Sequence, residues 1–151
     1  MPPITEHVVG FLFDQNRSHV LLIRKNRPTW QAGKFNGVGG HVEPDETPLA
    51  AMDRGFAEEA GLSGLAWEPV SILAGDTWCV HFFAAFDQSV SKARDMTDEP
   101  LTLMPMVGLA RAPLMADLPV MIALALDTSG IIKPVRMFDR IPQKDTAGEP
   151  E

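Results

Sequence analysis

The chain has 151 residues, of which 45% are hydrophobic and 22% are charged, and its formal net charge is -7. This size and mixture fit one globular domain with its own core. The negative charge argues against duplex nucleic acid or an anionic membrane as the main partner, because both bind basic protein surfaces. A small phosphate-bearing ligand is compatible with it, since a metal ion can bridge acidic side chains to phosphate.

Cys79 is the only cysteine of the sequence, so it has no partner for a disulfide within the chain. It lies in the apolar run TWCVHFFAAF, where we expect a buried and unreactive thiol. No stretch approaches the roughly 20 apolar residues of a membrane span, and the N-terminus has no basic region followed by an apolar segment. The sequence therefore predicts a cytoplasmic protein.

The first half of the chain predicts two strands and a glycine-rich loop. Residues 7–13 and 19–25 are apolar and β-branched, and the residues between them, 14–18, are typical of a turn. We expect the two strands to pair as a hairpin. Residues 26–46 are expected to form a loop that contains one short strand.

A helix is predicted to begin at Pro48, after Thr47 as its N-cap, and to end at Gly61 in a left-handed conformation. Apolar residues recur in it at helical spacing, and we expect them to form its buried face. These residues are Leu49, Met52, Phe56 and Ala60.

The next part of the chain predicts three strands. Residues 67–75 and 77–87 are expected to form an antiparallel pair, followed by a polar loop over residues 88–100. Residues 101–109 predict a further strand, although Pro105 interrupts the pattern.

Residues 117–127 predict a second helix, with Pro119 in its first turn. Strands that flank one helix and precede another indicate an α+β fold with a mixed β-sheet. We assign residues 1–140 to a single domain and expect residues 141–151 to be a disordered tail.

Two adjacent acids lie near the end of the first predicted helix. Glu58 is four residues after Arg54 and can pair with it, and Gly55 lies on the face of Glu58 and Glu59. Adjacent carboxylates at a helix C-terminus are destabilising by up to about 1 kcal/mol each, because the helix dipole is negative there. A bound Mg²⁺ or Mn²⁺ would remove this repulsion. A solvated acidic patch is the alternative.

Residues 40–62, GHVEPDETPLAAMDRGFAEEAGL, resemble the Nudix box, G-x5-E-x7-R-E-U-x-E-E-x-G-U, in which U is a bulky apolar residue. The matching residues are Gly40, Glu46, Arg54, Phe56, Glu58, Glu59, Gly61 and Leu62. Gly55 departs from the pattern, because the family has glutamate at that position. The resemblance extends over about residues 4–128 and implies the Nudix α/β/α sandwich with a mixed sheet.

Nudix enzymes hydrolyse a nucleoside diphosphate linked to another group, and Mg²⁺ or Mn²⁺ neutralises charge on the phosphates. The resemblance implies that Glu58 and Glu59 are metal ligands and that the Gly39 carbonyl is another. It also implies that Arg54 orients the carboxylates and that Glu46 supports the box from the loop before the helix.

The glutamate that is missing at Gly55 lies in the metal shell of the family and can help to activate water. Its loss is compatible with a slower enzyme, with a base elsewhere, or with a domain that binds nucleotide without turnover. Many Nudix proteins place a further acid before the late strand, and of Asp98 and Glu99 we expect Glu99 to take this role. A solvated loop acid is the alternative for both. Either close packing on this helix face or loss of the need for an acid would explain Gly55.

The segment GKFNGVGGHVE is similar to the one before the box in oxidised-purine nucleoside triphosphatases, which are MutT-like members of the family. In those enzymes the asparagine that matches Asn36 bonds the base; a turn-forming asparagine is the alternative. Trp30 can stack on a base or pack in the core or rim. Gly39 and Gly40 let a ligand approach the backbone closely. Nearby basic residues can attract a triphosphate: Arg24, Lys25, Arg27 and Lys34.

Asp117 lies near the position at which the late helix of those enzymes carries aspartates that read an oxidised base. The four histidines do not have the spacing of metal ligands. They are His7, His19, His41 and His81.

Three functions follow from these observations. The first is a Mg²⁺-dependent (d)NTP pyrophosphohydrolase that releases nucleoside monophosphate and pyrophosphate, with oxidised purine nucleotides among its candidate substrates. The second is a Nudix hydrolase of another diphosphate, such as a dinucleoside polyphosphate or a nucleotide sugar. The third is a catalytically impaired nucleotide-binding domain. The expected partner is a small nucleotide, and the resemblance also allows a homodimer, because family members are often dimers.

Overall fold

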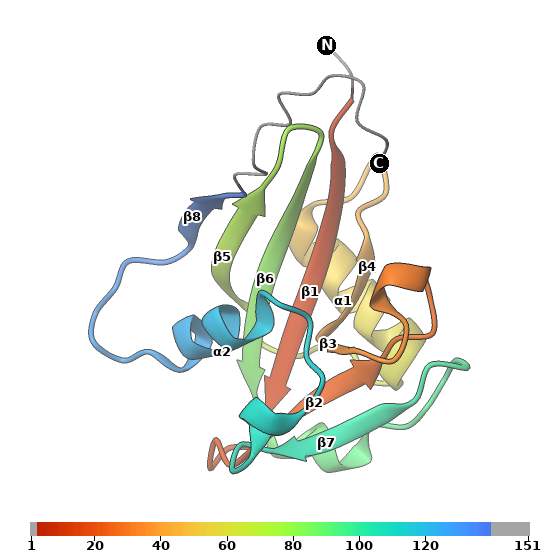
Figure 1. Cartoon of the computed structure of the whole chain (residues 1–151), viewed down its shortest axis with the longest axis vertical. Coiled ribbons are helices and arrows are strands. Elements are labelled where there is room, and N and C mark those ends of the chain that lie inside the picture. The colour runs from red at the N-terminus through yellow and green to blue at the C-terminus, as the bar shows by residue number, and fades with distance from the viewer. Residues whose placement is uncertain (1–2, 140–151) are drawn as a thin grey trace.

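The computed structural model describes residues 3–139, so the expected tail of residues 141–151 and the domain end at residue 140 lie outside the described part. Its α-helices are α1 (Pro48–Ala60) and α2 (Leu118–Leu126). Its strands are β1 (Thr5–Phe13), β2 (His19–Arg24), β3 (Phe35–Asn36), β4 (Val38–His41), β5 (Glu68–Ala74), β6 (Trp78–Phe86), β7 (Leu101–Pro105) and β8 (Val135–Phe138). Figure 1 shows these elements along the chain.

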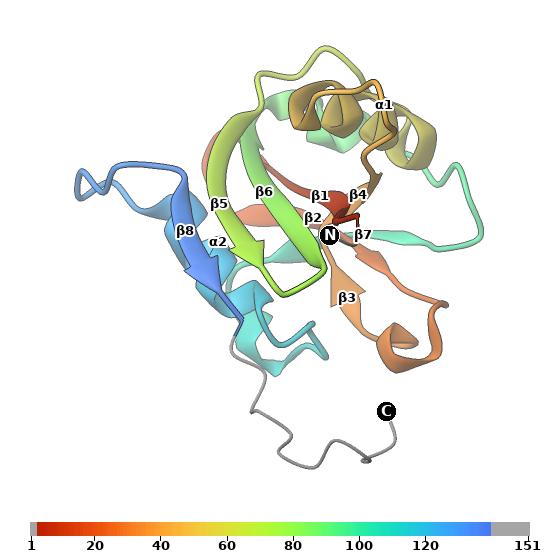
Figure 2. The ribbon, with the colours of Figure 1, turned by 90° about the horizontal axis from the view of Figure 1, so that it is seen from above.

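The strands form one mixed 8-stranded sheet with the order β3-β2-β1-β6-β5-β8, to which β4 is added at β1 and β7 at β2. Strand β1 runs parallel to β6, and β5 runs parallel to β8, whereas the other pairs are antiparallel. Figure 2 shows α1 and α2 on opposite sides of the sheet. The predicted mixed-sheet α/β/α sandwich is confirmed.

Alternate residues of β1 face the two helices, as the pleat of a strand requires. Val9, Phe11 and Phe13 belong to the core on the α2 side, where Leu118 is fully buried. Leu12 belongs to the core on the α1 side. Because each helix covers its own apolar layer, α1 is held on one face of the sheet with its polar side turned away from it.

The predicted ends of α1 are confirmed. The Thr47 hydroxyl accepts a hydrogen bond from the Ala50 backbone N–H at 3.1 Å, and Gly61 ends the helix with φ of 74°. Three residues of the predicted buried face, Met52, Phe56 and Ala60, are indeed fully buried. Leu49 is 51% exposed, so its assignment to that face was wrong. It lies in the first turn, whereas Ala51 and Gly55 complete the buried face.

Most of the remaining predicted elements are confirmed as well. The hairpin of β1 and β2 and the antiparallel pair of β5 and β6 form as expected. Strand β7 ends at Pro105, which lacks the N–H that the ladder would need. The sequence analysis missed β8, a short strand at the edge of the sheet. Cys79 is only partly buried, which corrects the expectation of a buried thiol.

Within residues 3–139, no helix has the length and apolar character that a membrane crossing requires.

Strand β4 approaches β1 so closely that only glycine fits at its centre. Gly39 pairs with Val9, and a Cβ added at Gly39 would lie 1.8 Å from the Val8 carbonyl oxygen. The neighbouring Gly40 has nothing within 4 Å of such a Cβ. The double glycine therefore has one position that packing requires and one that it does not.

We predict that Gly39→Ala lowers the free energy of unfolding by about 1–3 kcal/mol or more, since 1–3 kcal/mol is the usual range for overpacking. The matched variant Gly40→Ala should stay within about 0.5 kcal/mol of the native protein, because its added methyl group meets no neighbour. Urea unfolding of the two variants measures the difference. Equal stabilities would contradict the close contact between β4 and β1.

Candidate functional site

The two adjacent acids of α1 lie on different faces of the helix. Glu59 follows Met52, Gly55 and Phe56 by seven, four and three residues, so it continues the row that packs on the sheet. Glu59 is therefore half-buried, whereas Glu58 is exposed. The helix thus turns one carboxylate towards the sheet and one towards solvent.

Burial raises the pKa of Glu59 to about 7, and the surrounding charges modify this effect. The Lys25 ammonium lowers the pKa, the Glu99 carboxylate raises it, the Gly39 backbone lowers it, and Glu58 raises it slightly. Among residues 3–139, Glu59 takes part in no ion pair, because the Lys25 ammonium bonds Glu99 instead. Glu59 is thus a half-buried carboxylate that no cation pairs within residues 3–139, and its neighbours come from the box and from the segments beside it.

Gly55 lies directly over the backbone of β4. A Cβ added there would lie 3.7 Å from the Gly39 carbonyl carbon and 3.9 Å from its oxygen, which is ordinary van der Waals contact. Close packing therefore does not require glycine at this position. A Cβ at Gly55 would thus fit over the Gly39 backbone, whose hydrogen bond lowers the pKa of Glu59.

Arg54 joins the start of the box to its end. Its Nη2 donates to a Glu46 oxygen and to the His41 carbonyl, both at 2.9 Å, and its Nη1 donates to Glu58 at 3.1 Å. The side-chain hydrogen bond from Arg54 and a backbone bond from Glu43 hold the pKa of Glu46 at about 2. The predicted pairing of Arg54 with Glu58 is present, and Glu46 takes the larger share of the guanidinium.

Glu99 is buried, with an exposed fraction of 4%, and both of its oxygens accept hydrogen bonds. Lys25 Nζ donates to one oxygen at 3.0 Å, and the backbone N–H groups of Asn26 and Arg27 donate to the other at 2.7 and 3.2 Å. Burial raises the pKa of this carboxyl, but these donors outweigh burial, so the pKa lies below its usual value. Glu99 thereby fixes the loop before β7 to the end of β2, next to Glu59.

The exposed Asp98 pairs with the Arg27 guanidinium at the outer side of the same contact, and the Asn26 amide donates to the Asp98 carbonyl at 2.9 Å. Lys25 and Arg27, which we expected to attract a triphosphate, are thus engaged with acids of this loop. Arg24 and Lys34 have no ion pair within the described range. The pairing between the end of β2 and the loop has no local signal in the sequence, because the partners are more than 70 residues apart.

The segments expected to bind the base lie at the β3 end of the sheet. Asn36 uses its side-chain oxygen to accept from the Gly37 N–H at 2.8 Å, which is a turn contact. Trp30 is 65% exposed on the short 3-10 helix Thr29–Gln31. The Met115 N–H donates to the Phe35 carbonyl at 2.9 Å, which brings the chain before α2 alongside β3.

Asp117 lies at the start of α2 but makes no side-chain capping bond there. Burial raises the pKa of its carboxyl, and the nearby Asp139 raises it further. Residues 114–115 contact Phe35 immediately before it, so the start of α2, where Asp117 lies, is close to β3.

The donor set around Glu59 fits a hard divalent cation. Such ions bind carboxylate and carbonyl oxygens, and Glu59, Glu58 and the backbone of Gly39 supply these groups. Burial is the main cause of the raised pKa of Glu59, and within the described part of the chain no ion pair offsets it. A cation at this point would stabilise its charged form.

A family model described as a NUDIX domain matches residues 3–116. No functionally curated protein matches the sequence significantly. Solved structures do match it, at low identity and with the same fold.

One similar structure comes from a study of MutT from Aliivibrio salmonicida and Vibrio cholerae; it shares 20% identity with a TM-score of 0.68 and covers 80% of this chain and 96% of that one. The NUDIX domain of Shewanella oneidensis NrtR, complexed with ADP ribose, shares 16% identity with a TM-score of 0.69, over 83% and 88% of the two chains. A NUDIX family hydrolase from Clostridium perfringens shares 23% identity with a TM-score of 0.67, over 82% and 97%.

We predict that Glu46→Gln lowers stability at neutral pH but not in strong acid. The folded-state pKa of Glu46 is about 2, below its ordinary value of 4.5, so its ionised form stabilises the fold above pH 4.5. This contribution is lost as the pH falls from 4.5 through about 2. Urea unfolding at several pH values should show the gap between native protein and variant closing over that window.

The control is Glu43→Gln, which changes an exposed carboxylate of the same loop and should leave stability unchanged throughout. A gap for Glu46→Gln that persists undiminished at pH 2 would contradict the role of the ionised Glu46–Arg54 pair.

Proposed function

The chain belongs to the Nudix family, and on that premise we propose that it is a Mg²⁺-dependent (d)NTP pyrophosphohydrolase. It would release nucleoside monophosphate and pyrophosphate. The fold and the box are those of a family that hydrolyses nucleoside diphosphates linked to another group. The choice of a nucleoside triphosphate as substrate rests on the segment before the box and on its surroundings.

The position of Glu59 is the observation that carries this proposal. Its carboxylate is half-buried, lacks an ion-pair partner within residues 3–139, and lies beside the Gly39 backbone. A carboxylate with only a structural role at this point would raise the free energy of the folded state, and no interaction would compensate for it. A cation that bridges Glu59 to a phosphate would remove the penalty and would hold the pyrophosphate against the helix end.

Each flanking residue has a supporting role in this proposal. When bound, Mg²⁺ supplies positive charge to the phosphate oxygens during attack by water. Arg54 holds Glu58 in place and, through Glu46, fixes the loop that follows β4, the strand of Gly39. Glu99 was expected to be the further acid of the site; in this proposal it instead positions Lys25 beside Glu59, since both of its oxygens already accept hydrogen bonds.

The base of the nucleotide would lie at the β3 end of the sheet. Trp30 offers an exposed ring for stacking, and the Arg24 guanidinium lies 5.8 Å from the centre of the Phe35 ring at the same edge. Asn36 and Asp117 would provide polar contacts to the base edge. Burial raises the pKa of the Asp117 carboxyl, which can accept a hydrogen bond and, in its protonated form, can also donate one.

Gly55 favours a second candidate, a domain that binds nucleotides without turning them over. The family has glutamate in the metal shell at this position, and packing does not require the glycine. A glycine within a helix is also about 1 kcal/mol less favourable than alanine. Neither packing nor helix stability therefore explains why glycine replaces the acid. ADP-ribose belongs among the ligands to be tried, since the NrtR domain with the same fold was solved with it.

We predict that the native protein releases pyrophosphate from one or more (d)NTPs, 8-oxo-dGTP included, only when Mg²⁺ is present. Glu59→Gln should reduce the rate at least about 100-fold, because even the outer partners of metal ligands contribute about 10–100-fold. Gly55→Glu should raise the rate, since it restores the glutamate of the family's box and its Cβ would meet only ordinary van der Waals contacts. Gly55→Gln, of the same size but uncharged, separates the effect of charge from that of packing.

A native protein that is inactive on the whole panel, with ADP-ribose, a dinucleoside polyphosphate and a nucleotide sugar included, would overturn the proposal. Activity gained only by Gly55→Glu, together with nucleotide-dependent thermal stabilisation of the native protein, would establish the second candidate instead. Hydrolysis of ADP-ribose or a nucleotide sugar alone would keep the reaction and change the substrate.

A further inference from the structure

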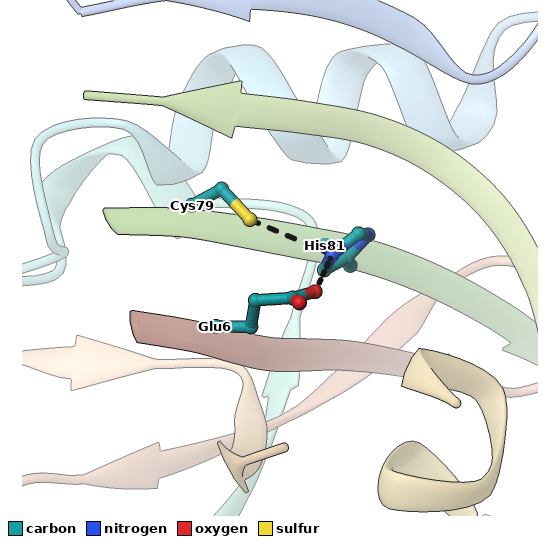
Figure 3. Close-up of side chains that lie close together, drawn as sticks. All are labelled: Glu6, Cys79 and His81. Atoms are coloured by element: carbon teal, nitrogen blue, oxygen red, sulfur yellow. Dashed lines mark hydrogen bonds and ion pairs between the residues drawn. The ribbon is translucent and has the colours of Figure 1, made fainter. Parts of the chain in front are cut away.

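A second group of metal-binding side chains lies outside the Nudix box. Figure 3 shows Glu6 from β1 and Cys79 and His81 from β6, with their side chains pointing towards one another. One potential ligand atom from each residue lies within 4.8 Å of the others. All three residues are partly exposed. The histidine spacing in the sequence did not reveal this group, because its partners are a cysteine and a glutamate.

The sheet register explains why the three side chains converge. Strands β1 and β6 are parallel, and Glu6 lies directly beside Cys79. Cys79 and His81 are two residues apart on one strand, so their side chains point to the same face. This is the face of Phe83, which packs on the α1 side. The signal in the sequence is therefore a Cys-x-His pattern on a strand whose neighbour carries an acid at the matching position.

The distances are close to those of a tetrahedral zinc site. Bond lengths of about 2.3 Å to sulfur and 2.0–2.1 Å to nitrogen and oxygen place neighbouring ligand atoms about 3.4–3.6 Å apart. The Cys79 sulfur lies 3.6 Å from His81 Nε2, which agrees with this spacing. His81 Nε2 lies 2.9 Å from the Glu6 carboxylate, so these two atoms would separate by about half an ångström. Glu6 is the most exposed of the three and can make this movement.

One nitrogen, His81 Nε2, faces both the Cys79 sulfur and the Glu6 carboxylate. A single N–H proton on this nitrogen can make one good hydrogen bond, and the ionised carboxylate is the better acceptor. The thiol then gains only a weak contact. A metal ion satisfies all three atoms together, with His81 neutral and protonated at Nδ1 and with the thiol proton released to water.

This group is separate from the nucleotide site. Gly39 pairs with Val9, which is three residues along β1 from Glu6 and so about 10 Å away. Cys79 and His81 lie on β6, on the other side of β1 from β4. None of the three belongs to the box.

We propose that Glu6, Cys79 and His81 together bind one Zn²⁺ ion, with water as the fourth ligand. Thiolate and imidazole ligands select a softer ion than the oxygen ligands around Glu59 do, so Zn²⁺ is favoured here and Mg²⁺ there. Three protein ligands and partial exposure are typical of an open zinc site. The ion would join the start of β1 to β6, where the sheet lies beyond the cover of α1.

Co²⁺ is the appropriate probe, because it replaces Zn²⁺ and its bond to a thiolate gives a charge-transfer band. We expect the chelator-treated protein, without a histidine tag and with Mg²⁺ in excess, to bind one equivalent of Co²⁺ with this band and with the intense visible bands of tetrahedral cobalt. Zn²⁺ should displace the cobalt. Cys79→Ser should abolish the charge-transfer band, and His81→Ala and Glu6→Gln should weaken binding at least about tenfold.

Two variants serve as matched controls. His41→Ala removes an exposed histidine elsewhere, and Glu59→Gln changes the nucleotide site; both should keep the cobalt spectrum. Circular dichroism establishes that each variant is folded, and Glu6→Gln tests the site without altering Cys79. The absence of a thiolate–cobalt band in the native protein would overturn the proposal. So would an unchanged cobalt affinity of His81→Ala, or a cobalt spectrum that disappears in Glu59→Gln.

Discussion

The close contact of β4 with β1 at Gly39 is the constraint on which the site depends. A side chain at Gly39 would collide with the Val8 carbonyl, so the strand can lie in this place only as bare backbone. The helix α1 then packs on the same backbone through Gly55. Because β4 is held between β1 and α1, the Gly39 backbone comes to lie beside the half-buried Glu59. Glycine at this point of β4 thus allows the close packing of β4 on β1, and the same packing places backbone groups where a ligand can bind.

The carboxylates around this contact differ in whether they have an ion-pair partner. Arg54 bonds Glu46 and Glu58 and so ties the loop before α1 to the helix, while Glu99 gathers the donors at the end of β2. Glu59 has no ion-pair partner among residues 3–139, although it lies between these two networks and its carboxyl takes a backbone hydrogen bond from Gly39. A carboxylate without an ion-pair partner in the described chain, surrounded by side chains that are held by hydrogen bonds, is the arrangement expected of a preorganised cation site.

Much of the fold could be predicted because it rests on local rules. Thr47 and Gly61 mark the ends of α1 by capping chemistry, and the box places its acids by helical spacing. Burial of Leu49 was predicted wrongly, since periodicity alone does not reveal where a helix leaves the sheet. The contacts of Glu99 and the convergence on His81 depend on strand register and loop closure across many residues. Such long-range pairing has no local signal in one sequence, so only the structure reveals it.

The central claim is that Glu59 and the Gly39 carbonyl hold a divalent cation against a bound nucleotide. A crystal structure with Mn²⁺ and an α,β-methylene nucleoside triphosphate tests it most directly, because the anomalous signal of manganese marks the ion and the methylene group prevents cleavage. An anomalous peak should lie within bonding distance of the Glu59 carboxylate, of the Gly39 carbonyl and of the phosphates. Bound nucleotide with no manganese at Glu59 would contradict it.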